Sequence, residues 1–559
     1  MNLNRFSIGT LGLLAVSGLA WSCSAKSDDC NANLNCAPYG GGAAGTSGAS
    51  SSGGKSGASG ASSASGNSGV GGTSGEGGIE QVAGTGGAPT PACDGSLSPD
   101  LDPCVIADGY GLFVSPDGDD PSADGTQAHP FATLTAALAS ITKIKRVYLC
   151  AADYEEPATI EIPDRVSIYG GFTCNGETWK YDSPLPAHLL PKSPIGATIA
   201  DAKVGVLIQD LRIDALNAED GAGASSFGLM INSSQGVALK RVEIRAGKGG
   251  KGKAGTDGAP IPDAIPSGEA QKGKAAECGT STMLLDGASA VGVQCTSQGG
   301  KGGDGTKGTQ NQMSADRDGK SGFPGASNGT VASQSANASG GDGKEGMAGI
   351  PGMLGSAAPS AGAFTDGGYV VASGGDGSSG QPGQGGGGGA SSFAGPACVG
   401  ASGGAGGMGG CGGTPGTGGG GGGASVALFS WNSSVSLDTC VLVAREGGAG
   451  GNAGKGREGG AGEDGGKGGA GNATNQVGVG GKGGAGGNGG NGGSGAGGTG
   501  GSSVALVWNG TMPVEKNTPV FQFAQKPAPG GLGGQLGLDP NNKAPDGSTG
   551  ATQGIHPKP

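Results

Sequence analysis

Short runs of alternating hydrophobic and polar residues recur along the chain, and each run is bounded by Pro, Asp or Gly. Alternation over this length predicts β-strands that turn one face toward a core. One earlier stretch differs, because its apolar residues recur at helical spacing and predict a short amphipathic helix. The apolar residues of the helix are Phe131, Leu134, Leu138 and Ile141, and those of the first strands are Val147, Leu149, Ile160, Ile162, Val166, Ile168, Ile208, Leu211 and Ile213.

One strand pattern occurs three times, beginning at Ser225, Ala424 and Ser502. Each copy runs from a strand through an Asn-centred turn into further alternation, which predicts stacked units with one shared core. A glycine-rich tract follows each of the first two copies directly, so we expect the tracts to be insertions at corners of the stack. Two islands, 283–295 and 367–372, would then be partial units. The matched inward positions are Val237, Leu239, Val242 and Ile244 in the first copy and Val435, Leu437, Cys440 and Leu442 in the second.

The segment VSPDGDDPSADGTQAHPFATLTAAL, followed by RVYLCAADYEEPATIEIPDRVSIYGGF, resembles the N-terminal cap and opening rungs of pectin-lyase-like right-handed parallel β-helix proteins. The resemblance spans residues 111–246. It implies an all-β fold, a right-handed parallel β-helix whose open end is covered by the amphipathic helix. A fold of this kind hosts several functions, so the resemblance implies no particular activity.

Glycine accounts for 133 of the 559 residues, and only 4% of the residues are aromatic. Glycine loses the most conformational entropy on folding and buries no side chain. The tracts must therefore be disordered or held by backbone hydrogen bonds. The tract GGAGGNGGNGGSGAGGTGG at 483–501 resembles the glycine-rich regions of mycobacterial PE-PGRS surface proteins, which implies packed polyglycine-II insertions, although the PE portion is missing. Disorder and an ordered bundle both remain open.

The first residues resemble a bacterial lipoprotein signal, with Arg5, an apolar stretch at 6–21 and then Cys23. The resemblance implies acylation of Cys23 and a membrane partner reached through the lipid anchor. Ser24 after the cysteine implies sorting to the outer membrane. Ala20 departs from the family, which prefers Leu at that place, so an ordinary secretory signal is the alternative.

These patterns divide the chain into eight expected parts. They are a signal peptide (1–22), a Ser/Gly-rich tether (23–92), the cap and first rungs (93–246), glycine-rich insertions with strand islands (247–423), a rung (424–446), a glycine-rich insertion (447–501), a last rung (502–525) and a polar tail (526–559).

Twelve cysteines in an exported chain are expected to be oxidised. Once Cys23 is set aside, Cys440 lies in a strand pattern and is expected to be a buried thiol. The other ten fall into couples of near neighbours, although sequence alone does not prove connectivity. The couples are Cys30 with Cys36, Cys93 with Cys104, Cys150 with Cys174, Cys278 with Cys295, and Cys398 with Cys411.

The net charge of −12 argues against a nucleic-acid partner. The chain has no CxxC pair and only three histidines, His129, His188 and His556, so we expect no bound metal or other cofactor. An acidic cluster before the helix suits either calcium or, preferably, turn and capping roles. Its members are Asp117, Asp119, Asp120 and Asp124.

Alternation places a set of charged residues on the outer face of adjacent rungs, where carbohydrate-active β-helices carry their acids and bases. The set comprises Asp210, Arg212, Asp214, Lys240, Arg241, Glu243 and Arg245. The catalytic signatures of that family, including any GHG run, are absent, so a solvated outer face and no enzymatic activity are expected. Trp431 and Trp508 are candidate glycan contacts, or else a stacked position of the repeat.

The sequence thus predicts an exported surface lipoprotein with a structural, adhesive or interaction role, in contact with surface glycans or other envelope proteins. A divergent polysaccharide-active or glycan-binding protein is the alternative.

Overall fold

The computed structural model describes residues 93–176, 178–182, 186–290, 292–308, 316–325, 329–330, 337–538 and 540–556. The expectations for Cys23, Cys30, Cys36 and the tether lie outside these residues. No helix in the described ranges is long and apolar enough to cross a membrane. The helices found there are α1 (Leu134–Ala139) and the short 3₁₀ turns η1 (Pro103–Val105), η2 (Glu269–Gln271), η3 (Ala473–Asn475) and η4 (Pro540–Asn542).

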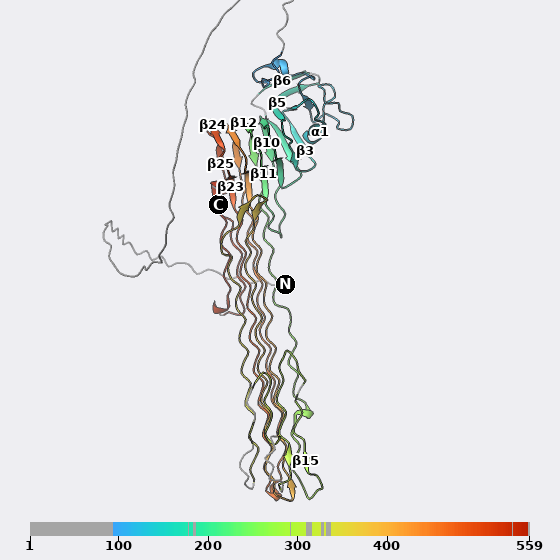
Figure 1. The fold of residues 1–559 in the computed structure, drawn as a ribbon, viewed down its shortest axis with the longest axis vertical. Helices are drawn as coiled ribbons and strands as arrows, with labels where there is room; N and C mark the ends of the chain where they lie inside the picture. The colour runs from blue at the N-terminus through green and yellow to red at the C-terminus, as the bar shows by residue number, and fades with distance from the viewer. Residues whose placement is uncertain are drawn as a thin grey trace, which may run out of the picture. The chain divides into compact units, whose positions relative to one another are not determined.

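Three parallel sheets make up most of the regular structure, as Figure 1 shows. The first sheet holds β1 (Leu112–Val114), β2 (Arg146–Cys150), β5 (Ser167–Asn175), β9 (Val206–Gln209), β12 (Val237–Lys240), β21 (Val435–Asp438) and β24 (Val514–Lys516), with β6 (Thr178–Tyr181) antiparallel to β5. The second sheet holds β3 (Asp153–Glu156), β7 (Ala187–Pro191), β10 (Leu211–Asp214), β13 (Glu243–Arg245), β22 (Val441–Val443) and β25 (Val520–Gln522). The third sheet holds β4 (Ile160–Glu161), β8 (Ile195–Ala200), β11 (Ser226–Asn232), β20 (Ser425–Trp431), β23 (Ser503–Asn509) and β26 (Thr552–His556).

The chain passes from the first sheet to the second, then to the third, and then returns to the first. We call each such pass a circuit. Val237 lies beside Val435, and Leu239 beside Leu437, in the first sheet. The register of the sequence repeat is therefore confirmed. The inward side chains form one buried cluster, and each Val, Leu or Ile in it contributes about 1.5–3 kcal/mol on transfer from water.

The corners of successive circuits repeat an unusual backbone conformation. Asp210, Arg241 and Thr439 all have left-handed φ angles, of 56°, 51° and 54°, where the first sheet gives way to the second. Non-glycine residues rarely adopt this conformation. Here each amide donates to the next circuit, for example Asp210 N–H to the Lys240 carbonyl at 3.1 Å, so the ladder of hydrogen bonds offsets the strain.

Helix α1 begins at the cap residue Thr133, whose hydroxyl accepts from the Ala136 amide. The buried carboxylate of Glu156 accepts from the Leu134 and Thr135 amides, at 2.7 and 3.1 Å, and so satisfies further free donors of the first turn. The helix is shorter than the spacing predicted. Phe131 and Ile141 lie outside it, but both still contact the main core.

Neither island between the glycine tracts forms part of a circuit, so the prediction of partial units is wrong. β15 (Leu284–Leu285) pairs antiparallel with β16 (Gly305–Thr306), and β17 (Ala363–Thr365) forms a hairpin with β18 (Gly368–Val370). Two aromatic residues of the hairpin, Phe364 and Tyr369, cover an apolar patch on the outer face of the third sheet. The hairpin thus buries apolar side chains on the outer face of the third sheet, which would otherwise be exposed to solvent. A last antiparallel pair joins β14 (Glu277–Cys278) to β19 (Cys398–Val399).

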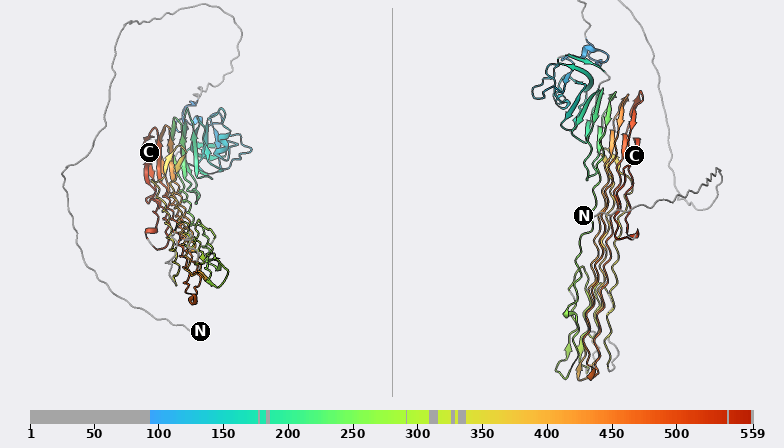
Figure 2. Two further views of the ribbon diagram at one scale, coloured as in Figure 1. Left: turned by 60° about the horizontal axis from the view of Figure 1, so that its bottom comes forward. Right: turned by 180° about the vertical axis from the view of Figure 1, so that it is seen from behind.

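The glycine-rich segments run side by side in both views of Figure 2 and are joined by main-chain hydrogen bonds. We call them the glycine lattice, comprising 247–258, 298–305, 316–323, 337–356, 372–392, 399–424, 444–471, 478–502, 527–536 and 543–551. The bonds recur every third residue. Gly404, Gly407 and Gly410 donate to Gly481, Gly484 and Gly487 at 2.9, 2.8 and 2.9 Å.

The lattice explains why glycine occupies particular rows. A Cβ atom added at Gly406 would lie 1.9 Å from the carbonyl oxygen of Gly386, a distance that no side chain tolerates. The inner segment 399–424 is bonded to 372–392, 444–471 and 478–502, whereas 337–356 is bonded to two segments. Accordingly 483–501 has glycine at about two positions in three, and 343–355 at one in three.

Candidate functional site

A cluster of charged side chains lies on the outer face of the second sheet. We call it the His188 cluster, and its members are Asp153, His188, Arg212, Asp214, Glu243 and Arg245. The strand register brings them together, because Asp153 lies beside His188 and Arg212 lies between His188 and Glu243. Alternation turns Leu189 and Ile213 inward and leaves these polar neighbours outside.

His188 lies between two carboxylates. Its Nδ1 is 2.9 Å from Asp153 Oδ1, and its Nε2 is 2.8 Å from Asp214 Oδ2. The imidazole side chain is 19% exposed, so it remains reachable from solvent. An imidazole donates to two carboxylates at once only when it is protonated, and to one when it is neutral. This arrangement is able to hold or pass a proton at the sheet surface.

Two arginines surround the same carboxylates. Arg212 donates to Asp214, and this hydrogen bond raises the pKa of the Arg212 guanidinium against the opposing effect of burial. Arg245 Nε donates to Glu243 Oε1 at 2.6 Å and lies 3.7 Å from Asp214 Oδ1. The cluster therefore carries nearly balanced charge and suits a neutral polar ligand, such as one rich in hydroxyl groups, better than a strongly charged one.

Asp210 does not belong to this face, and its expected outward position is wrong. Its side chain is 2% exposed. Arg241 donates to both of its oxygens, at 2.6 and 2.8 Å, and the Tyr181 hydroxyl bonds to it as well. Lys240 lies 2.9 Å from Asp100. These residues tie the segment that follows Cys93 to the first sheet, which is a structural role.

The sequence predicted no contact of His188 with carboxylates, and suggested the residue only as a possible metal ligand. The signal was present, because His188 stands between the inward residues Ala187 and Leu189. The nearby prolines of the stretch SPLPAHLLP obscured that strand.

The acidic cluster before α1 holds turns together. Asp120 accepts from the amides of Ala132 and Thr133, at 2.6 and 3.0 Å. Asp119 accepts from the Ser122 hydroxyl, and Asp124 from the Thr126 amide. The hydrogen bonds from Thr126 lower the pKa of Asp124. In the part of the chain that the structure describes, no group of three or more His, Cys, Asp or Glu residues is placed to hold a metal ion.

Four disulfides join eight of the nine described cysteines. Cys93 is bonded to Cys104 and Cys150 to Cys174, as the near-neighbour couples predict. Cys278 is instead bonded to Cys398, 120 residues away. The remaining bond joins Cys295 to Cys411.

The near-neighbour couples are therefore wrong for these last four cysteines, because the lattice brings segments from distant parts of the sequence side by side. Cys440 is a buried free thiol, and its burial raises its pKa.

Trp431 and Trp508 do not form a shared surface. Trp431 lies beside Asn509, and Trp508 lies beside Ser430, so the two rings are one residue out of register and occupy opposite faces of the third sheet. Trp431 stacks on Phe429 with an interplanar angle of 6°, whereas Trp508 contacts the main core. The expectation of one stacked position is wrong.

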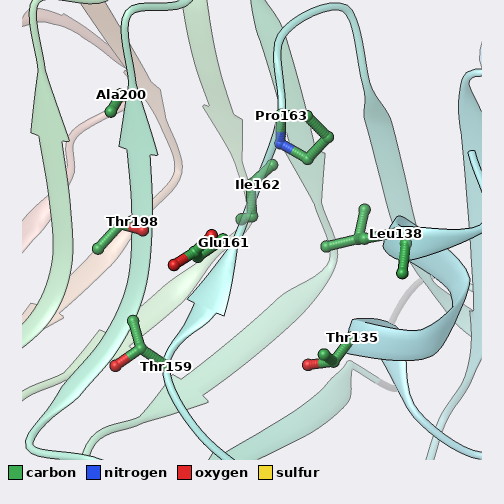
Figure 3. A pocket seen from close by; sticks show the side chains of 9 residues that line it. Thr135, Leu138, Thr159, Glu161, Ile162, Pro163, Thr198 and Ala200 are labelled. Atoms are coloured by element: carbon green, nitrogen blue, oxygen red, sulfur yellow. The ribbon is translucent and has the colours of Figure 1, made fainter.

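A cleft of about 600 Å³ opens between α1 and the third sheet, as Figure 3 shows. Thr135, Thr159 and Thr198 supply hydroxyl groups to its lining, and Glu161 is the one charged residue there. The Thr135 hydroxyl already donates to Glu156. The cleft therefore offers no acid and base pair, and the His188 cluster is the stronger candidate.

The described elements define a mostly β protein built of parallel sheets, with glycine-rich segments joined to it by main-chain bonds. No protein-family description, curated protein or solved structure matches this chain. Functional proposals therefore rest on its own residues.

Proposed function

We propose that the protein is an exported, non-enzymatic surface lipoprotein, anchored through Cys23, in which a right-handed parallel β-helix carries polyglycine-II insertions. The repeated passage through three sheets supports the β-helix, and crossovers between parallel strands are right-handed in nearly all proteins. Hydrogen bonds at every third residue support polyglycine-II, which has three residues per turn.

The observation that carries a structural role is the way the glycine lattice uses its main chain. Segment 399–424 exchanges amide–carbonyl bonds with 372–392, 444–471 and 478–502. Its side chains are small apart from that of Met408, so the bonds between segments replace a large apolar core. Such an element is stiff and uniform along its length. It suits a scaffold or an adhesive surface that meets other envelope components, glycans included.

The disulfides support export to an oxidising compartment. Four bonds lie within the described residues, and two of them fasten the lattice at Cys278–Cys398 and Cys295–Cys411. A lattice without a large apolar core gains more from such links than a conventional domain does.

The test is intact-mass analysis of the protein extracted from host membranes, compared with a Cys23→Ala variant. We expect an acyl mass increment on the peptide that begins at Cys23, and its loss together with membrane release in the variant. An unacylated product that leaves the membrane fraction in both cases would refute the anchor. Hydrogen exchange tests the scaffold separately, since lattice amides such as Gly407 should exchange as slowly as amides of β20.

A second candidate is glycan binding or cleavage at the His188 cluster, and the contacts of His188 with Asp153 and Asp214 favour it. Purified protein would be incubated with acidic and neutral polysaccharides. Turnover or binding that Asp214→Asn abolishes and Glu155→Gln preserves would establish this candidate. Glu155 is the matched control, because it is an exposed carboxylate in the same sheet, paired with Lys192. No binding and no turnover with any polysaccharide would remove it.

A further inference from the structure

Three large apolar side chains stand in a row on the edge of the glycine lattice. We call them the Met–Ile–Met ridge: Met347, Ile350 and Met353, which are 67, 72 and 77% exposed. They belong to segment 337–356, which is bonded to neighbours on two sides. A cleft of about 460 Å³ beside them is lined by Pro324, Pro351 and Pro382 among others.

The three-residue hydrogen-bond repeat holds the ridge in line. Gly346, Gly349 and Gly352 donate to the carbonyls of Ala485, Asn488 and Asn491, at 2.8, 2.8 and 2.7 Å. Each ridge residue directly follows one of these glycines, so all three point from the same face of the strand. At about 3.1 Å per residue the ridge side chains are spaced by roughly 9 Å.

The surroundings of the ridge carry no charge. No charged residue occurs from 346 to 365, and none occurs from 377 to 392 in the adjoining segment. The whole chain has a net charge of −12, which keeps copies apart over most of the surface. Edge strands of soluble proteins usually carry charges that prevent association, and this one carries none from 346 to 356.

We propose that the ridge is a contact between two copies of this chain, related by a two-fold axis at Ile350. The order Met–Ile–Met is the same in both directions, and the spacing is equal on each side. A two-fold contact needs a surface that matches its own reversed copy. With the strands antiparallel, Ile350 meets its own equivalent, and Met347 meets Met353 of the second copy.

The same arrangement avoids electrostatic conflict. The charged residues nearest to the ridge, Lys344 and Glu345, then lie opposite Ser356 and Gly355 of the second copy. Three side chains with their neighbours bury much less than the roughly 800 Å² per partner of a stable dimer. The contact is therefore weak in dilute solution and becomes populated when copies are concentrated, as on a shared surface. It does not depend on the proposed anchor.

Cross-linking tests the geometry. Ile350→Cys in the full chain is treated with a short bismaleimide at high protein concentration, and Leu532→Cys is the matched control. Leu532 is 59% exposed on another lattice segment. We expect dimer formation at least tenfold faster at position 350. A mixture of Met347→Cys and Met353→Cys should cross-link faster than either variant alone. Equal rates at 350 and 532 would overturn the proposal.

Sedimentation tests the contact without cross-links. The average mass of the wild type should rise with concentration, whereas Ile350→Asp should stay monomeric and Leu532→Asp should behave as the wild type. Both replaced side chains are exposed, so neither change should unfold the protein. Self-association that survives Ile350→Asp, or a wild type that stays monomeric, would refute the two-fold contact. Binding of a monomer to lipid vesicles, lost in Ile350→Asp, would assign the ridge to a membrane instead.

Discussion

The Ser433 hydroxyl accepts a 3.0 Å hydrogen bond from the amide of Ser234, 199 residues earlier in the chain. Both side chains are buried at the corner where the third sheet gives way to the first. Circuits separated by a long glycine tract are therefore stacked as closely as consecutive ones. The tract between them adds a lattice without interrupting the core.

The lattice should be intolerant of a single methyl group at its inner rows. We expect Gly406→Ala to destabilise the protein by about 1–3 kcal/mol, because the added Cβ would overlap the Gly386 carbonyl and force segments apart. Gly109→Ala is the control, since nothing lies within 4 Å of a Cβ there. Thermal unfolding compares them. Equal melting temperatures would argue against close packing of the lattice.

Removing the cysteine of β14 should free a specific distant partner. In Cys278→Ser we expect Cys398 to be the one new free thiol beside Cys440, and Cys295 to stay bonded to Cys411. Loss of a bond that closes so long a loop should cost about 2–5 kcal/mol. Alkylation of the unfolded protein before reduction, followed by peptide mass analysis, identifies the thiol. Finding Cys295 alkylated instead would restore the near-neighbour couples.

The ion pair of Asp100 with Lys240 should make stability depend on acid pH. Burial opposes ionisation of Asp100, but hydrogen bonds from Ser98 and Lys240 outweigh it and lower the pKa of Asp100 to about 2. A carboxyl with a depressed pKa stabilises the folded state above its unfolded pKa of about 4, and this stability is lost as pH falls through its folded value.

Asp100→Asn should therefore be less stable than the wild type at neutral pH, and the difference should shrink between about pH 4 and pH 2. Asp263→Asn replaces an exposed carboxylate and serves as the control. Denaturant unfolding at several pH values measures both. A difference that stays constant down to pH 2 would show that the charge of Asp100 does not matter.

Glu515 should protect the last strand of the first sheet from association. It lies beside Leu437, in the position that earlier circuits fill with an inward apolar residue. A charge at such a position on an edge strand prevents pairing with another chain. Glu515→Leu should increase self-association in sedimentation, while Asp438→Leu, on the inner strand β21, should not. If the average mass in sedimentation is the same for both variants as for the wild type, a feature other than Glu515 protects this edge strand from association.

Local pattern determined much of this protein. The alternation of Val237 and Leu239, repeated at Val435 and Leu437, predicted both the strands and their register, because inward positions must be apolar wherever they occur. The sequence also predicted the helix near Leu134 and the disulfides Cys93–Cys104 and Cys150–Cys174, because the residues that interact in each are close together in the chain.

The tertiary structure decided what depends on distant neighbours. Asp210 and Asp214 look alike in sequence, yet Arg241 and Tyr181 enclose the first, whereas the second meets His188 on an open face. The disulfide partners of Cys278 and Cys295 depended on which glycine-rich segments lie next to each other in the folded protein. Those segments share the same three-residue glycine repeat. Judged by sequence alone, many alignments of one segment against another would therefore provide hydrogen-bond partners for their main-chain amides. Only the packing of the whole lattice distinguishes one alignment from another. The local sequence around each bonded residue is too similar to that of other segments to identify its partner.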